Sequence, residues 1–71
     1  MMSLAEAESL ASEINALSGW CALIEENVFD GGYLVRAWDY GSNRRHGAHV
    51  FRAARHWQTY IRAHEKALAK G

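Results

Sequence analysis

The sequence predicts an α+β fold in the order helix, two- or three-stranded antiparallel sheet, helix (αβββα or αββα), and three observations lead to it. Apolar residues recur at helical spacing near both ends of the chain. Between them, segments 20–25 and 33–40 alternate with a period of two, and each is followed by a glycine-containing turn sequence. Because each helix has an apolar stripe to bury, we expect both helices on one sheet face, in a single domain over residues 1–71.

The first helix is predicted from a capping box. Ser3 precedes Glu6 by three residues, so the serine oxygen is expected to accept from the Glu6 amide while the glutamate reaches back to the Ser3 amide. Gly19 suits the left-handed conformation that ends many helices. These features predict a helix over roughly residues 4–18. Its apolar stripe is formed by Leu4, Ala7, Leu10, Ala11, Ile14 and Leu17.

A β-hairpin follows from the two alternating segments. The sequence Asp30-Gly31-Gly32 between them tolerates the positive φ angles of a tight turn. In the first strand, the two alternating sets are Trp20, Ala22 and Ile24, and Cys21, Leu23 and Glu25. In the second strand they are Tyr33, Val35 and Ala37, and Leu34, Arg36, Trp38 and Tyr40. Alternation alone leaves open which set the helices cover and which set forms an open sheet face.

Two interpretations fit residues 45–51. After the turn sequence Gly41-Ser42-Asn43, they form either a short third strand or the first part of the last helix. From about Arg52 the apolar spacing is helical, which predicts a C-terminal helix. Its stripe consists of Ala54, Trp57, Ile61, His64 and Leu68, with Tyr60 beside it.

Charge is segregated along a chain whose formal net charge is zero. Residues 1–30 contain six acidic residues and no Lys or Arg, whereas residues 31–71 contain all eight basic residues and two acidic ones, Asp39 and Glu65. The formal charges of the two halves are therefore −6 and +6. This pattern indicates either an acidic and a basic face or two halves that neutralise each other on packing.

Cysteine and histidine usage argues against several kinds of site. Cys21 is the only cysteine, which excludes an internal disulfide and a thiolate zinc site and favours a reducing, cytoplasmic compartment. Neither a signal peptide nor an apolar segment of membrane-spanning length is expected. If the third strand forms, His46 and His49 fall on its opposite faces, and His56 is two helical turns from His64, so no metal site is expected. His64 is expected at the core edge or at a helix end.

No group of residues in the sequence indicates catalysis. Cys21 lies in mid-strand among apolar residues, not in the electropositive setting that activates a thiolate. Glu25 and Glu26 are neighbours on a strand and point to opposite faces. Gly31-Gly32 lacks the lysine and hydroxyl of a phosphate-binding loop. We therefore expect a protein that is not an enzyme and uses no cofactor.

Basic and aromatic residues of the second half form the candidate binding surface. Arginine binds phosphate and carboxylate groups bidentately, and arginine and tryptophan often anchor protein interfaces. The predicted partner-binding residues are Arg36, Trp38, Tyr40, Arg44, Arg45, Arg52 and Arg55. In the alternative interpretation, Arg52, Arg55 and Arg62 belong only to the solvated face of the last helix.

In size, charge segregation and lack of catalytic motifs, the whole chain resembles the small proteins with which phages and other mobile elements inhibit host systems, anti-CRISPR proteins among them. That resemblance implies a bacterial host protein or nucleoprotein complex as the partner. The order helix, three strands, helix also resembles double-stranded-RNA-binding domains, but this chain lacks the lysine-rich start of their last helix.

The sequence therefore predicts an inhibitor or adaptor that binds and occludes a host protein or nucleoprotein. The alternative is a small nucleic-acid-binding protein with an arginine-rich face, whose affinity would fall steeply with salt. A third hypothesis is a purely structural homodimer.

Overall fold

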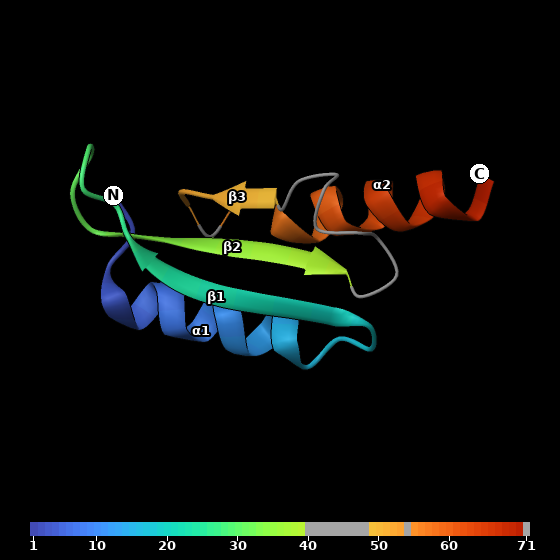
Figure 1. The fold of residues 1–71 in the computed structure, drawn as a ribbon, viewed down its shortest axis with the longest axis horizontal. Helices are drawn as coiled ribbons and strands as arrows, with labels where there is room; N and C mark the ends of the chain where they lie inside the picture. Colours follow the sequence, from blue (N-terminus) through green and yellow to red (C-terminus); the bar gives the residue numbers. More distant parts are fainter. Residues whose placement is uncertain (40–48, 54, 71) are drawn as a thin grey trace.

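The computed structural model confirms the α+β arrangement, with a helix, three antiparallel strands in one sheet and a second helix (Figure 1). It describes residues 1–39, 49–53 and 55–70, with residues 68–70 described by their backbone alone. The elements in chain order are α1 (Leu4–Asn15), β1 (Trp20–Glu26), β2 (Tyr33–Asp39), β3 (His49–Phe51) and α2 (Trp57–Lys70).

Helix α1 begins where the capping box predicts. The Ser3 hydroxyl accepts from the Glu6 amide and the Glu6 carboxylate accepts from the Ser3 amide, each at 3.1 Å. The helix ends at Asn15 and not at residue 18, and the Asn15 side chain is engaged with β1. Its Oδ1 accepts from the Ala22 N–H at 2.8 Å, and its Nδ2 donates to the Ala22 carbonyl at 3.3 Å. Asn15 thus occupies backbone groups that an edge strand otherwise exposes.

The sheet has the order β1-β2-β3, and both pairings are antiparallel. Strands β1 and β2 pair over all seven residues of each, which confirms the predicted hairpin. Gly31 and Gly32 have φ angles of 79° and 71° in the turn. A Cβ atom on Gly32 would lie 2.6 Å from the Met2 carbonyl oxygen, so the turn requires glycine there for both its conformation and its close contact.

Both helices pack on one face of the sheet, as the sequence predicts. Helix α1 packs on β1 and β2. Figure 1 shows α1 lying along β1, and α2 beside β3 with its C-terminal part extending past the end of the sheet. The side chains of Trp57 and Ile61 join α2 to the core that α1 forms with the strands. The buried residues of this core are Met2, Ala7, Leu10, Ala11, Ile14, Trp20, Ala22, Val35, Ala37, Phe51, Trp57 and Ile61.

The structure therefore decides which alternating set faces the helices. Val35 and Ala37 lie under the helices, and Arg36 and Trp38 lie on the helix-free face, as the binding hypothesis required. Leu34 is also on the helix-free face, yet it is buried. Because β2 is the central strand, its side chains are flanked by those of both neighbouring strands.

Residues 49–51 belong to a third strand and not to the last helix. The predicted turn at 41–43 and the first part of the predicted strand, residues 45–48, lie outside the described residues.

Helix α2 begins at Trp57, so the predicted start near Arg52 is wrong. His56 has a φ angle of 60°, a left-handed conformation that cannot continue a right-handed helix, and its carbonyl accepts from the Thr59 N–H at the start of α2. Ala54 and the Leu68 side chain lie outside the described residues. Among the described helices, none is long and apolar enough to cross a membrane.

Candidate binding site at the β3 edge

Strand β3 lies at an edge of the sheet, and its middle residue turns its backbone groups outwards. In an antiparallel ladder, residues that bond to one neighbouring strand alternate with residues that point away from it. The Tyr33 N–H donates to the Met2 carbonyl at 2.9 Å and so points away from β1. The backbone of Val35 therefore points the same way, towards its partner Phe51 in β3. Val50, next to Phe51, consequently directs its N–H and C=O away from β2, towards the outer side of β3.

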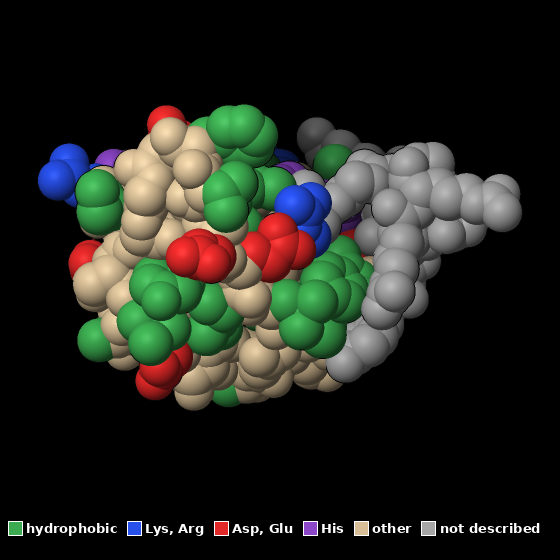
Figure 2. Space-filling view, turned by 60° about the vertical axis from the view of Figure 1, so that its left-hand side comes forward, with side chains coloured by type: hydrophobic (Ala, Val, Ile, Leu, Met, Phe, Trp, Pro, Cys, Tyr) green, Lys and Arg blue, Asp and Glu red, His purple; other side chains and the backbone are tan. Residues whose placement is uncertain are grey.

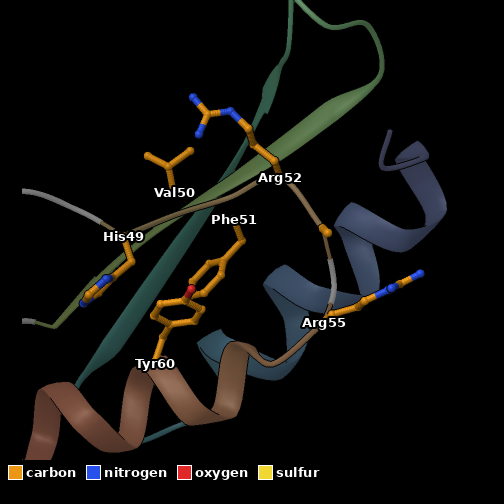
Figure 3. A pocket seen from close by; sticks show the side chains of 7 residues that line it. His49, Val50, Phe51, Arg52, Arg55 and Tyr60 are labelled. Carbon is orange, nitrogen blue, oxygen red and sulfur yellow. The ribbon is translucent and has the colours of Figure 1, made fainter.

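A pocket of about 280 Å³ lies beside this edge (Figure 3). Part of its wall is aromatic, because the rings of Phe51 and Tyr60 meet edge to face with their centroids 6.0 Å apart. Figure 3 shows both rings on the α2 side of β3, whereas Val50 and Arg52 project to the opposite side. The Tyr60 residue is 57% exposed, so its ring is accessible from solvent. The pocket is lined by His49, Val50, Phe51, Arg52, Ala53, Arg55 and Tyr60.

Two of the lining residues are arginines without a carboxylate partner in the described part of the chain. Arg52 and Arg55 are both exposed, and neither takes part in the ion pairs found there. In Figure 3 their side chains leave the chain in different directions. They therefore spread positive charge along the pocket rim, and they do not converge on one point.

Arg36 differs from these two arginines because Glu25 neutralises it. Its Nε and Nη2 atoms donate to the two carboxylate oxygens of Glu25, each at 3.0 Å. These hydrogen bonds lower the pKa of Glu25 and raise the pKa of Arg36. Since the guanidinium already has a bidentate partner, Arg36 is less available to an anionic ligand than Arg52 or Arg55.

Four of the seven predicted partner-binding residues are described. Arg36 and Trp38 lie on the helix-free face, and Arg52 and Arg55 lie at the pocket beside β3. Val50 connects the two places, because it pairs in register with Arg36 and also lines the pocket. The other three residues, Tyr40, Arg44 and Arg45, lie outside the described residues.

The interpretation of these arginines as a solvated helix face is confirmed for Arg62, which is exposed on α2, and is wrong for Arg52 and Arg55, because both precede α2.

Three titratable side chains from three elements meet at the end of the sheet that is remote from the hairpin turn. His64 of α2 bonds through Nε2 to the Asp39 carboxylate of β2, and its Nδ1 lies 3.3 Å from Nε2 of His49 in β3. Trp20 of β1 packs edge-on against His64, with ring centroids 5.4 Å apart. The His64 side chain is 24% exposed, which confirms its predicted place at the core edge. We call Asp39, His64 and His49 the His–Asp cluster.

The sequence prediction missed this cluster. Alternation places Asp39 on the same face as Val35 and Ala37, and the helical stripe includes His64, but only His64 was expected near the core edge. Their meeting with His49 depends on the pairing of β3 with β2, in which Ala37 is opposite His49. No local pattern in the sequence contains that register.

Hydrogen bonding in the His–Asp cluster sets the proton positions. Burial lowers the pKa of His49, the nearby His64 lowers it further, and the charge of Asp39 partly opposes both effects. An ionised carboxylate only accepts, so His64 donates from Nε2 and, when neutral, presents a lone pair at Nδ1. His49 then donates to that lone pair from its own Nε2.

No group of three or more His, Cys, Asp or Glu side chains in the described segments could hold a metal ion. Cys21 is half-buried on the helix-free face, opposite Trp38.

The hairpin end of the sheet exposes apolar side chains. Phe29 is 94% exposed and Val28 is 76% exposed, next to the acidic Asp30. Figure 2, in which this end is turned forward, shows hydrophobic side chains mixed with Asp and Glu side chains. At the β3 edge, by contrast, a pocket, the outward backbone groups of Val50 and two arginines without carboxylate partners among the described residues occur together.

Comparison of the chain with protein-family models, with curated proteins and with solved structures finds no significant match.

Proposed function

We propose that this protein is a small non-enzymatic binding protein, an inhibitor or adaptor that occludes its partner, and that it holds an extended acidic segment of a partner protein along the β3 edge. The observation that carries this proposal is the pocket beside β3, where an aromatic wall and two arginines adjoin the last strand of the described sheet. The edge strand suits the backbone of such a segment, the arginines suit its carboxylates, and the aromatic wall suits an apolar side chain.

The backbone of the partner would pair with β3. An extended peptide can add to an exposed sheet edge through main-chain hydrogen bonds, while its alternate side chains enter pockets. The outward N–H and C=O of Val50 supply one such pair of hydrogen bonds. The other edge is less suitable, because Asn15 already occupies the backbone groups of Ala22 in β1.

The side chains of the partner would meet charge and aromatic rings. Carboxylates suit the guanidinium groups of Arg52 and Arg55, which pair well with planar anions. A pocket of about 280 Å³ lies just below the size usual for small-molecule sites, roughly 300–1,000 Å³, so it suits a single apolar or aromatic side chain packed against Phe51 and Tyr60. The site thus supports peptide recognition better than binding of a large cofactor.

A small nucleic-acid-binding protein is the second candidate. The exposed Tyr60 ring, in a pocket that Arg52 and Arg55 also line, suits a stacked base with its phosphate. However, Arg36 is neutralised by Glu25 on the adjoining face, which reduces the positive charge that a longer phosphate backbone needs. The outward backbone N–H and C=O of Val50 would also have no role in binding a stacked base.

The resemblance to phage and mobile-element inhibitors extends this proposal to a host protein or nucleoprotein as the partner and to a cytoplasmic place of action. The host partner and the cytoplasmic place of action are predictions. The purely structural homodimer and the contribution of Trp38 and Arg36 to the interface are predictions as well.

The first test is direct binding of a labelled short peptide of alternating Glu and Val residues with one central Phe. We expect the double variant Arg52→Gln/Arg55→Gln to weaken binding by roughly tenfold, since each exposed ion pair contributes about 0.2–1 kcal/mol. The matched control is Arg62→Gln, which removes an exposed arginine of α2 that does not line this pocket.

A peptide with Gln in place of Glu and a single-stranded oligonucleotide separate the two candidates. Preference for the acidic peptide over both probes supports the proposal. Preference for the oligonucleotide, or equal binding of the Glu and Gln peptides, contradicts it.

A further inference from the structure

The binding pocket depends on how α2 is placed. Tyr60 is the lining residue that comes from α2, whereas the others come from β3 and the segment that follows it. Farther along the same helix, His64 contacts both Asp39 and His49. The His–Asp cluster therefore joins α2 to two strands at one place, a single helical turn from the residue that forms the pocket wall.

Protonation of both imidazoles is incompatible with the contact between His49 and His64. The contact between His49 Nε2 and His64 Nδ1 is a hydrogen bond when one of these two nitrogens carries a proton and the other presents a lone pair. If both rings are protonated, two N–H groups and two positive charges face each other at that contact. Of the described elements around the cluster, β1 contributes Trp20, which does not titrate, and β2 contributes Asp39, whose single carboxylate already bonds to His64.

We propose that the His–Asp cluster is a proton-operated clamp, which holds α2 on the sheet while at most one of the two imidazoles is protonated and releases it when His49 and His64 are both protonated. Acidification would then open the pocket beside β3 and release its ligand. The consequence for the ligand rests on the proposed function, whereas the clamp itself does not.

The direction of the pH effect follows from His49. Its pKa is lowered in the folded protein, mainly by burial and then by His64. Because the docked state favours the neutral form of His49, His49 makes its full contribution to docking at pH values above the ordinary imidazole pKa. That stabilisation is lost as the pH falls from about 6.5 through the lowered pKa of His49, because the undocked form binds the proton more readily.

The test is amide hydrogen exchange in α2, measured without any ligand from about pH 8 to about pH 5.5 and corrected for the intrinsic pH dependence of exchange. In the wild type we expect a severalfold loss of protection in α2 on acidification, with less change in α1. In His49→Gln, whose amide N–H can still donate to His64 and does not titrate, we expect that loss to disappear. The matched control is His56→Asn, which removes an exposed histidine outside the cluster. Residue 56 has a positive φ, which asparagine tolerates, so this variant should show the same pH dependence as the wild type.

Two outcomes would overturn the clamp: protection of α2 that does not change with pH in the wild type, or the same pH dependence in His49→Gln. An NMR titration of the wild-type histidines tests the clamp even if the variant does not fold, because His49 must titrate below the ordinary imidazole range. Failure of the acidic peptide to bind at any pH would contradict the proposed function alone, since the exchange experiment contains no peptide.

Discussion

The segment from α1 to β2 and the segment from β3 to α2 are built differently. In the first, α1 has a complete capping box and covers two long strands with fully buried side chains such as Ala7, Ile14 and Val35. In the second, the strand has three residues, and the helix starts after a residue with positive φ. A cluster of titratable groups forms part of the contact between α2 and the sheet.

This difference indicates that the two segments contribute differently to stability and to binding. Apolar burial of Ile14 and Val35 does not depend on pH, whereas the contact through His49 and His64 does. Segments with fewer apolar contacts open at lower free energy than the core. We therefore expect the first segment to act as the scaffold and the second to carry the adjustable binding edge.

The largest expected effect is that of Ile14→Ala in α1. Ile14 is completely buried, and truncation of a buried isoleucine to alanine costs about 2–5 kcal/mol. A domain of this size has a total stability of only a few kcal/mol, so the variant should be largely unfolded by circular dichroism at room temperature. A urea midpoint within error of the wild type would contradict the scaffold role of α1.

Ile61→Ala in α2 should have a smaller and more local effect. Ile61 is also buried, but truncation of its side chain should mainly release α2 from the sheet. We expect the free energy of opening measured by amide exchange in α2 to fall by about 2 kcal/mol. Hydrogen exchange should show the amides of β1 and β2 still protected. If Ile61→Ala lowers the protection of the hairpin as much as Ile14→Ala does, the two segments unfold as one unit and the comparison fails.

Asn15→Ala sharpens the comparison between the two sheet edges. It removes the two hydrogen bonds to the Ala22 backbone and should destabilise the protein by about 1 kcal/mol in urea unfolding. It also opens the β1 edge, which should produce concentration-dependent association in analytical ultracentrifugation. Ser12→Ala, on the exposed part of α1, is the matched control and should remain as the wild type.

The smallest expected effect concerns the pair of Glu25 and Arg36. Because Arg36 lowers the pKa of Glu25, the pair stabilises the folded state above the ordinary Glu value, and this contribution is lost as the pH falls through the lowered pKa. Both side chains are 42% exposed, so solvent screens the interaction and the change should be near the detection limit.

Glu25→Gln should therefore leave the urea midpoint at neutral pH almost unchanged. Its informative effect is on binding, because it frees Arg36 on the helix-free face. Tighter binding of the acidic peptide by Glu25→Gln would extend the interface to that face, and unchanged binding would confine it to the β3 edge.

Local patterns predicted several elements correctly. The capping box of Ser3 and Glu6, the glycines of the hairpin turn and the alternation of both long strands depend on residues close together in sequence. The placement of both helices on one face also followed, because each had one apolar stripe to bury. These features need no knowledge of how distant segments align.

The errors have a common physical origin. Arg52 and Arg55 fit a helical pattern, but His56 adopts a left-handed conformation that delays the start of α2. The neutralisation of Arg36 depends on the hairpin bringing Glu25 beside it on one face. Periodicity shows which face a side chain occupies and does not show which neighbour it meets.

The sequence by itself determined the order of the elements, the capped first helix, the hairpin and the apolar faces, because these follow from local conformational preference and from periodicity. Only the tertiary structure decided that Arg36 is paired while Arg52 and Arg55 flank a pocket, and that His64 joins Asp39 to His49. The reason is that strand register and helix docking bring together groups far apart in the chain, and their charges and hydrogen bonds exist only once those segments have packed.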